Sequence, residues 1–92
     1  MKVVINQRYG GFSVSNKFME HYGIPISMAY DIDRYDSRLI EYIETYGSEA
    51  ASGWAANLVI VDIPPETYYR INEYDGYEFI EYRDEVEWLV AN

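Results

Sequence analysis

The segment from 69 to 82 holds two β-prone runs joined by the dipeptide Asp75-Gly76. Asp-Gly favours a two-residue type I′ turn, because both central residues of that turn need positive φ, and so short a loop fixes the strand register. The expected cross-strand pairs are Tyr74 with Tyr77, Ile71 with Ile80, Arg70 with Glu81 and Tyr69 with Tyr82. The segment is therefore predicted to form a β-hairpin.

The two faces of this hairpin differ in character. One face carries side chains that suit a core, namely Tyr69, Ile71, Ile80 and Tyr82. The other carries Tyr74, Tyr77 and Phe79 beside the Arg70/Glu81 pair. Three aromatic rings on a face that could have been polar indicate an interface with a partner chain, including another copy of this one. The alternative is ordinary strand propensity, which accounts for most of the eleven tyrosines.

The N-terminal segment concentrates unusual backbone chemistry. Residues 2–6 form a short apolar, β-branched run typical of a central strand covered on both faces. A double glycine follows, and Ser15 can then cap a helix that ends at Gly23. Paired glycines allow positive φ or a close approach, and a helix start attracts anions.

These features make the segment from 6 to 15 the candidate ligand site. The residues assigned to it are Asn6, Arg8, Tyr9, Gly10, Gly11, Phe12, Ser13 and Ser15. Phosphate would lie on the N–H groups near Ser13 and Ser15, Arg8 would add a charge-assisted bond, and Tyr9 or Phe12 would stack on a base. The alternative is a tight structural turn, because a lone Gly-Gly lacks the spacing of known phosphate-binding motifs.

Two further elements complete the expected architecture. Asp36 is a good N-cap for a second helix, in which apolar residues recur at helical spacing until Gly47. A second strand is expected over 57–63, before Pro64-Pro65. The prediction is one α+β domain over residues 1–92, with two helices packed on a sheet of about four strands that includes the hairpin.

Composition excludes several function classes. The chain has no cysteine, which removes disulfides and thiolate metal sites, and no metal or cofactor is expected. The net charge is −9, so binding to nucleic acid through phosphate contacts is not expected. The longest aliphatic run, 58–61, is far too short to span a membrane, and no signal peptide is evident, which predicts a cytoplasmic protein.

Five short motifs together resemble a widespread family of small, largely uncharacterised phage and prophage proteins. They are Val4-Ile5-Asn6, Gly10-Gly11-Phe12-Ser13, Arg34-Tyr35-Asp36, Val61-Asp62-Ile63-Pro64 and Glu73-Tyr74-Asp75-Gly76. The resemblance covers most of the chain and implies an α+β fold and a phage origin, hence the cytoplasm of an infected bacterium. Members of the family often carry a cysteine where this chain has Arg8, so a thiol role does not apply here.

Three functional hypotheses follow. The first is a phage counter-defence protein that sequesters a nucleotide-type immune signal in the segment from 6 to 15. The second is an acidic inhibitor of a host defence or nucleic-acid-binding protein, acting through acids at 73, 75, 78, 81, 84, 85 and 87. The third is a structural or regulatory phage protein that uses the Tyr74/Tyr77/Phe79 face. No nucleophile with its base is evident, so an enzyme is not expected.

Overall fold

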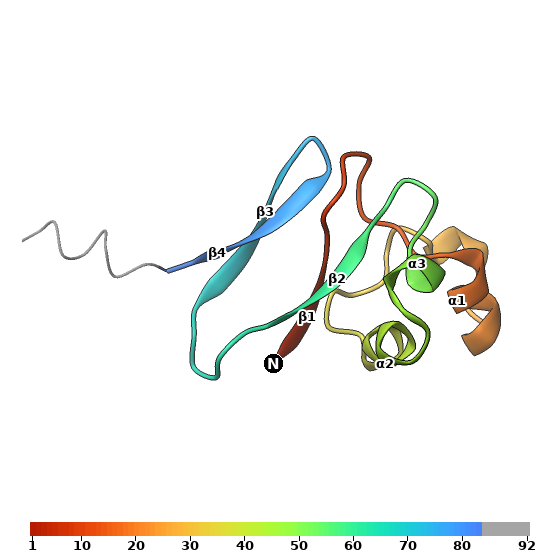
Figure 1. Ribbon diagram of the computed structural model, residues 1–92, viewed down its shortest axis with the longest axis horizontal. Coiled ribbons are helices and arrows are strands. Elements are labelled where there is room, and N and C mark those ends of the chain that lie inside the picture. Colours follow the sequence, from red (N-terminus) through yellow and green to blue (C-terminus); the bar gives the residue numbers. More distant parts are fainter. Residues whose placement is uncertain (84–92) are drawn as a thin grey trace, which may run out of the picture.

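The computed structural model describes residues 1–83 and shows, in that range, an α+β fold with four strands and three α-helices (Figure 1). Its elements are β1 (Lys2–Asn6), α1 (Asn16–Tyr22), the 3-10 turn η1 (Ile26–Met28), α2 (Ser37–Tyr46), α3 (Ser48–Ala51), β2 (Leu58–Asp62), β3 (Tyr69–Tyr74) and β4 (Tyr77–Tyr82). The α+β class and the C-terminal hairpin are confirmed.

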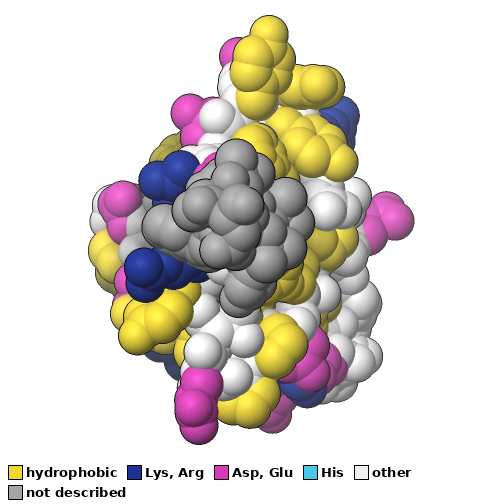
Figure 2. All heavy atoms as spheres, turned by 90° about the vertical axis from the view of Figure 1, so that its left-hand side faces the viewer, with side chains coloured by type: hydrophobic (Ala, Val, Ile, Leu, Met, Phe, Trp, Pro, Cys, Tyr) yellow, Lys and Arg dark blue, Asp and Glu magenta, His cyan; other side chains and the backbone are white. Residues whose placement is uncertain are grey.

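The hairpin has the predicted register. Tyr74 lies opposite Tyr77 and Tyr69 opposite Tyr82, and both turn residues have positive φ, 51° at Asp75 and 85° at Gly76. Figure 2 looks onto the hairpin side of the molecule and shows hydrophobic side chains gathered at its upper end, where the β3–β4 turn lies in Figure 1. Tyr82, which the alternation placed in the core, is 41 % exposed.

The four strands form two antiparallel pairs, β1 with β2 and β3 with β4, instead of one continuous sheet. The free edge of β1 shows why. The N–H of Val4 donates to the carbonyl of Arg34 at 2.6 Å, and the N–H of Asn6 donates to the Glu78 carboxylate at 3.0 Å. Because these donors are satisfied by a loop carbonyl and a side chain, β4 approaches β1 without forming a ladder.

β1 and β2 lie between the hairpin and the helices (Figure 1). Val3 and Ile5 face the hairpin, where Tyr69, Ile71 and Ile80 pack around them and Ile63. Val4 faces the helices and is also fully buried. The prediction that this strand is covered on both faces is therefore confirmed, whereas the prediction that it is a central strand is wrong, because within the described residues β1 pairs only with β2.

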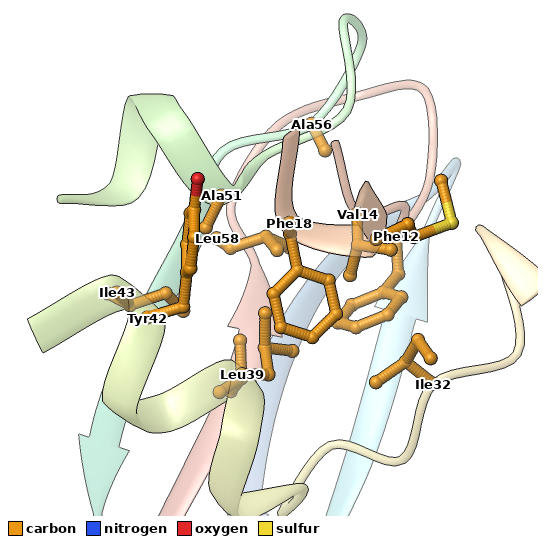
Figure 3. Packing of buried hydrophobic residues seen from close by; sticks show 12 residues of the cluster. Phe12, Val14, Phe18, Ile32, Leu39, Tyr42, Ile43, Ala51, Ala56 and Leu58 are labelled. Carbon is orange, nitrogen blue, oxygen red and sulfur yellow. The ribbon is translucent and has the colours of Figure 1, made fainter. Parts of the chain in front are cut away.

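The main core lies between β1–β2 and the helices. Figure 3 shows side chains converging there from α1, α2 and the loops before and between them. Phe18 of α1 is completely buried and meets the ring of Tyr42 of α2 edge to face, with 5.5 Å between ring centroids. Ser15 and Asp36 cap the two helices as predicted, and α1 ends at Gly23 in the left-handed region. These caps fix where each helix begins and hence where the preceding loop lies.

Candidate functional site

The predicted ligand segment divides into an exposed outer part and a buried inner part. Arg8, Tyr9 and Gly10 are exposed, whereas Asn6, Phe12 and Ser13 are buried. Gly11 and Ser15 are half-buried. The segment therefore presents only its first turn to solvent.

Asn6 is the centre of the inner part and has no exposed surface. Its Nδ2 donates to the carbonyls of Arg8, at 2.7 Å, and Gly76, at 2.8 Å. Its Oδ1 accepts the N–H of Asn57 at 2.8 Å. One side chain thus holds together the segment, the hairpin turn and the start of β2, and its polar atoms are satisfied by the protein itself.

Phe12 is covered by Arg34. The guanidinium carbon lies 3.5 Å from the centre of the Phe12 ring, and the same group forms a two-pronged pair with Glu78, at 3.2 and 2.5 Å. Glu78 is buried, and its Oε1 also accepts the N–H of Asn6. Sequence reasoning missed Arg34 and Glu78 as a pair, since 44 residues separate them and alternation alone does not identify a partner.

Ser15 and its neighbours are engaged within the protein. The N–H of Val14 donates to Ala29 and that of Ser15 donates to Ala51. The Ser15 hydroxyl accepts the N–H of Phe18 and donates to the Ala50 carbonyl. The hydroxyl of buried Ser13 lies where a side chain on Gly53 would fall, only 2.0 Å from such a Cβ. The N–H groups of Val14 and Ser15 are therefore satisfied within the protein, whereas a hollow of about 500 Å³ lined by Ser15, Asn16, Lys17, Tyr46, Glu49 and Ala50 lies beside the helix start.

The structure brings the ligand segment and the aromatic hairpin face together. The Tyr9 ring lies 5.4 Å from that of Tyr77 and 6.5 Å from that of Tyr74, centroid to centroid. The N–H of Gly10 donates to the carbonyl of Asp75 at 3.4 Å. Two candidate regions that are more than sixty residues apart in sequence are thus neighbours on one surface.

A groove of about 690 Å³ opens on the other side of the same segment. Residues that line it include Gln7, Arg8, Ser48, Glu49, Trp54 and Asn57. Arg8 donates from one guanidinium nitrogen to the Trp54 carbonyl at 3.1 Å, and Trp54 is 90 % exposed. The groove therefore has a cation and an aromatic ring at its rim.

Several side-chain N–H groups border this groove. Within residues 1–83 three side-chain donors have no hydrogen-bond partner: the side-chain amide of Gln7, the Nδ2 of Asn57 and the indole N–H of Trp54. Arg8 uses one of its donors. Glu49, which also lines the groove, contributes an exposed negative carboxylate. Sequence reasoning missed Trp54, which lies between Gly53 and Ala55 outside the predicted helices and strands.

The described part of the chain contains neither a cluster of metal-binding side chains nor a membrane-spanning helix. Residues 1–83 contain no group of three His, Cys, Asp or Glu side chains close enough to hold a metal ion. Over the same range no helix has the length and apolar character needed to cross a bilayer.

Comparisons with protein-family models, curated proteins and solved structures found no match for this chain. The resemblance to phage proteins consequently stays a prediction.

Proposed function

We propose that the protein is a non-catalytic binding protein for an anionic, nucleotide-type small molecule, which it holds in the groove beside Arg8 and Trp54. One observation carries this proposal: Trp54, which is 90 % exposed, and Arg8, whose guanidinium donates to the Trp54 backbone carbonyl, line the same groove. An aromatic ring can stack on the base of a nucleotide, and a cation in the same groove can bind its phosphate.

Trp54 supports the base-binding half of the proposal. A tryptophan with nearly all of its surface in water contributes little to the core, and the cluster of buried residues does not include it. Every nucleobase offers a flat face, and stacking on an aromatic ring typically contributes about 1–3 kcal/mol per base. Trp54 takes the stacking role that the sequence had assigned to Tyr9 or Phe12.

Arg8 supports the phosphate-binding half. Its hydrogen bond to the Trp54 carbonyl holds the guanidinium at the rim and leaves further N–H donors for an anion. The Gln7 and Asn57 amides add neutral donors nearby. The Glu49 carboxylate repels negative charge. A ligand with one phosphate near Arg8 is therefore favoured over a polyphosphate.

The biological role that fits this site is sequestration of a nucleotide-type immune signal inside an infected bacterium. That role and the phage origin rest on the sequence resemblance. Useful sequestration needs roughly nanomolar affinity, about −12 kcal/mol, which favours a more enclosed site than one open groove supplies. We therefore expect a second wall from another subunit when the ligand is bound.

The experiment is a binding measurement by native mass spectrometry and calorimetry, with nucleoside monophosphates and cyclic dinucleotides as probes. Arg8→Ala and Trp54→Ala are each expected to weaken binding roughly tenfold or more, because each removes one principal contact. Arg70→Ala and Tyr30→Ala are matched controls, since both remove an exposed side chain of the same kind away from the groove.

The proposal fails if none of these probes binds, or if a bound probe is held equally well by Trp54→Ala. Both side chains are exposed, so the variants should keep the unfolding temperature of the parent protein, and thermal unfolding checks this.

A further inference from the structure

The turn end of the hairpin forms a second exposed surface, distinct from the groove. We define the hairpin-tip surface as Tyr9, Glu73, Tyr74, Asp75 and Tyr77. Tyr9 is 61 % and Tyr74 is 72 % exposed, and Phe79 extends the aromatic area along β4. This end of the molecule is where hydrophobic side chains gather in Figure 2.

The rings of this surface are held in place before any partner arrives. Tyr9 contacts Tyr77 and Tyr74 at 5.4 and 6.5 Å between centroids. The loop that carries Tyr9 is tied to the hairpin by the hydrogen bond from Gly10 to Asp75 and by the bond from Asn6 to Gly76. A partner therefore meets fixed rings, which lowers the entropy cost of binding.

The charges at this surface are negative and uncompensated. Glu73 and Asp75 are exposed and border a shallow hollow of about 350 Å³ over Gly10, Gly11 and Gly76. Within residues 1–83 neither carboxylate forms an ion pair, and Glu73 accepts only the N–H of Gly76. An aromatic ring face and a carboxylate without an ion-pair partner each attract an organic cation.

Charge complementarity decides which occupant suits the surface. A second copy of this chain carries the same acids, and the whole chain has a net charge of −9, so self-association here would bring like charges together. A nucleic acid is disfavoured for the same reason. An arginine or lysine side chain can lie over a tyrosine ring while its charged end reaches a carboxylate.

We propose that the hairpin-tip surface binds a basic, arginine- or lysine-bearing segment of another protein. The inference does not depend on the nucleotide groove. It joins the aromatic hairpin face and the acids at 73 and 75 into one site, with a cationic side chain over Tyr9 and Tyr74 and its charge next to Glu73 and Asp75.

The test measures fluorescence anisotropy of a labelled peptide of alternating arginine and glycine, with a glutamate-glycine peptide as its counterpart. Tyr74→Ala and Asp75→Asn should each weaken binding of the basic peptide roughly fivefold. Asparagine adopts positive φ readily and Asn-Gly is the preferred type I′ turn, so Asp75→Asn preserves the hairpin. Glu41→Gln is the matched control, because it removes one exposed negative charge from α2 and thus equals Asp75→Asn in net charge.

Three results would overturn the proposal: no binding of the basic peptide, equal weakening by Glu41→Gln and Asp75→Asn, or a native dimer that Tyr74→Ala dissolves. Equal weakening would show attraction to net charge alone, and the dimer would assign the surface to a second copy. Trp54→Ala should leave peptide binding unchanged, so failure here and failure of the nucleotide proposal are separate outcomes.

Discussion

A Cβ on Gly76 would lie 2.4 Å from the backbone nitrogen of Gly11, so the β3–β4 turn rests directly on the double-glycine loop. The loop and the turn lie side by side at the upper edge of Figure 1. No side chain fits between the two backbones at this point. This contact joins the ligand segment to the hairpin and places Tyr9 against Tyr77.

Gly76→Ala should therefore destabilise the protein by about 2–4 kcal/mol. The positive φ of 85° accounts for roughly 1–2 kcal/mol and the clash with Gly11 for the remainder. Gly23→Ala is the matched control, because Gly23 also has positive φ but a Cβ there meets nothing within 4 Å. Urea unfolding measures both, and equal losses would show that the turn does not rest on the loop as described.

Glu78→Gln should cost about 3 kcal/mol of unfolding free energy. Arg34 is mostly buried over Phe12 and would lose the charge that it faces, and an unpaired charge of this kind is expensive. Glu81→Gln in the same strand breaks the pair with Arg70, which is exposed, and should cost less than about 1 kcal/mol. Chemical denaturation compares the two variants. Similar losses would mean that the Arg34–Glu78 pair is no more important than a surface pair.

Asn6→Ala should cost about 3 kcal/mol and loosen the loop. It leaves the Gly76 carbonyl and the Asn57 N–H without their partner, and an unsatisfied buried group typically costs about 1–3 kcal/mol. Nuclear Overhauser contacts between the Tyr9 and Tyr77 rings should weaken as well. Asn72→Ala, at a half-buried amide on the outer hairpin face, serves as the control and should preserve those ring contacts. Unchanged ring contacts in Asn6→Ala would contradict this role.

The Asp36 cap should make stability depend on pH in the acid range. The Arg38 guanidinium, hydrogen-bonded to the Asp36 carboxylate, lowers the pKa of Asp36 below its ordinary value of 3.8. A group whose folded-state pKa is lowered stabilises the protein above its unfolded-state pKa, and this contribution is lost as the pH falls through the folded-state value. Asp36→Asn keeps a capping oxygen and removes the charge.

The free energy difference between the parent protein and Asp36→Asn should be present at about pH 7 and shrink as the pH falls through the folded-state pKa of Asp36, which lies below 3.8. Urea unfolding at about pH 7 and at a series of acidic pH values measures it. A difference that stays constant or grows on acidification would rule out the ion pair as its source.

The local elements were predictable because each depends on residues close together in sequence. Asp75-Gly76 specified the turn and register of the hairpin, and Ser15 and Asp36 specified two helix starts. The continuous apolar, β-branched run in residues 2–6 likewise predicted a strand covered on both faces.

The candidate site was only partly predictable for the same reason. Arg8 and Tyr9 were expected in a ligand-binding segment and lie exposed in it, but Arg8 contacts the backbone carbonyl of Trp54, 46 residues away. Phe12 was one of two rings expected to stack on a base and lies beneath Arg34, which the sequence had placed only in the Arg34-Tyr35-Asp36 motif.

The sequence by itself determined the turns, the caps and the alternation of buried and exposed positions, since these follow from backbone preferences and from burial of apolar side chains. Tertiary structure alone decided that the strands form two pairs, that Glu78 meets Arg34 and that Tyr9 meets the hairpin. Such contacts depend on which hydrogen-bond donors and charged groups come close to one another when the hairpin, the β1–β2 pair and the helices pack together. Many residues offer the same chemistry, and only the folded geometry selects among them.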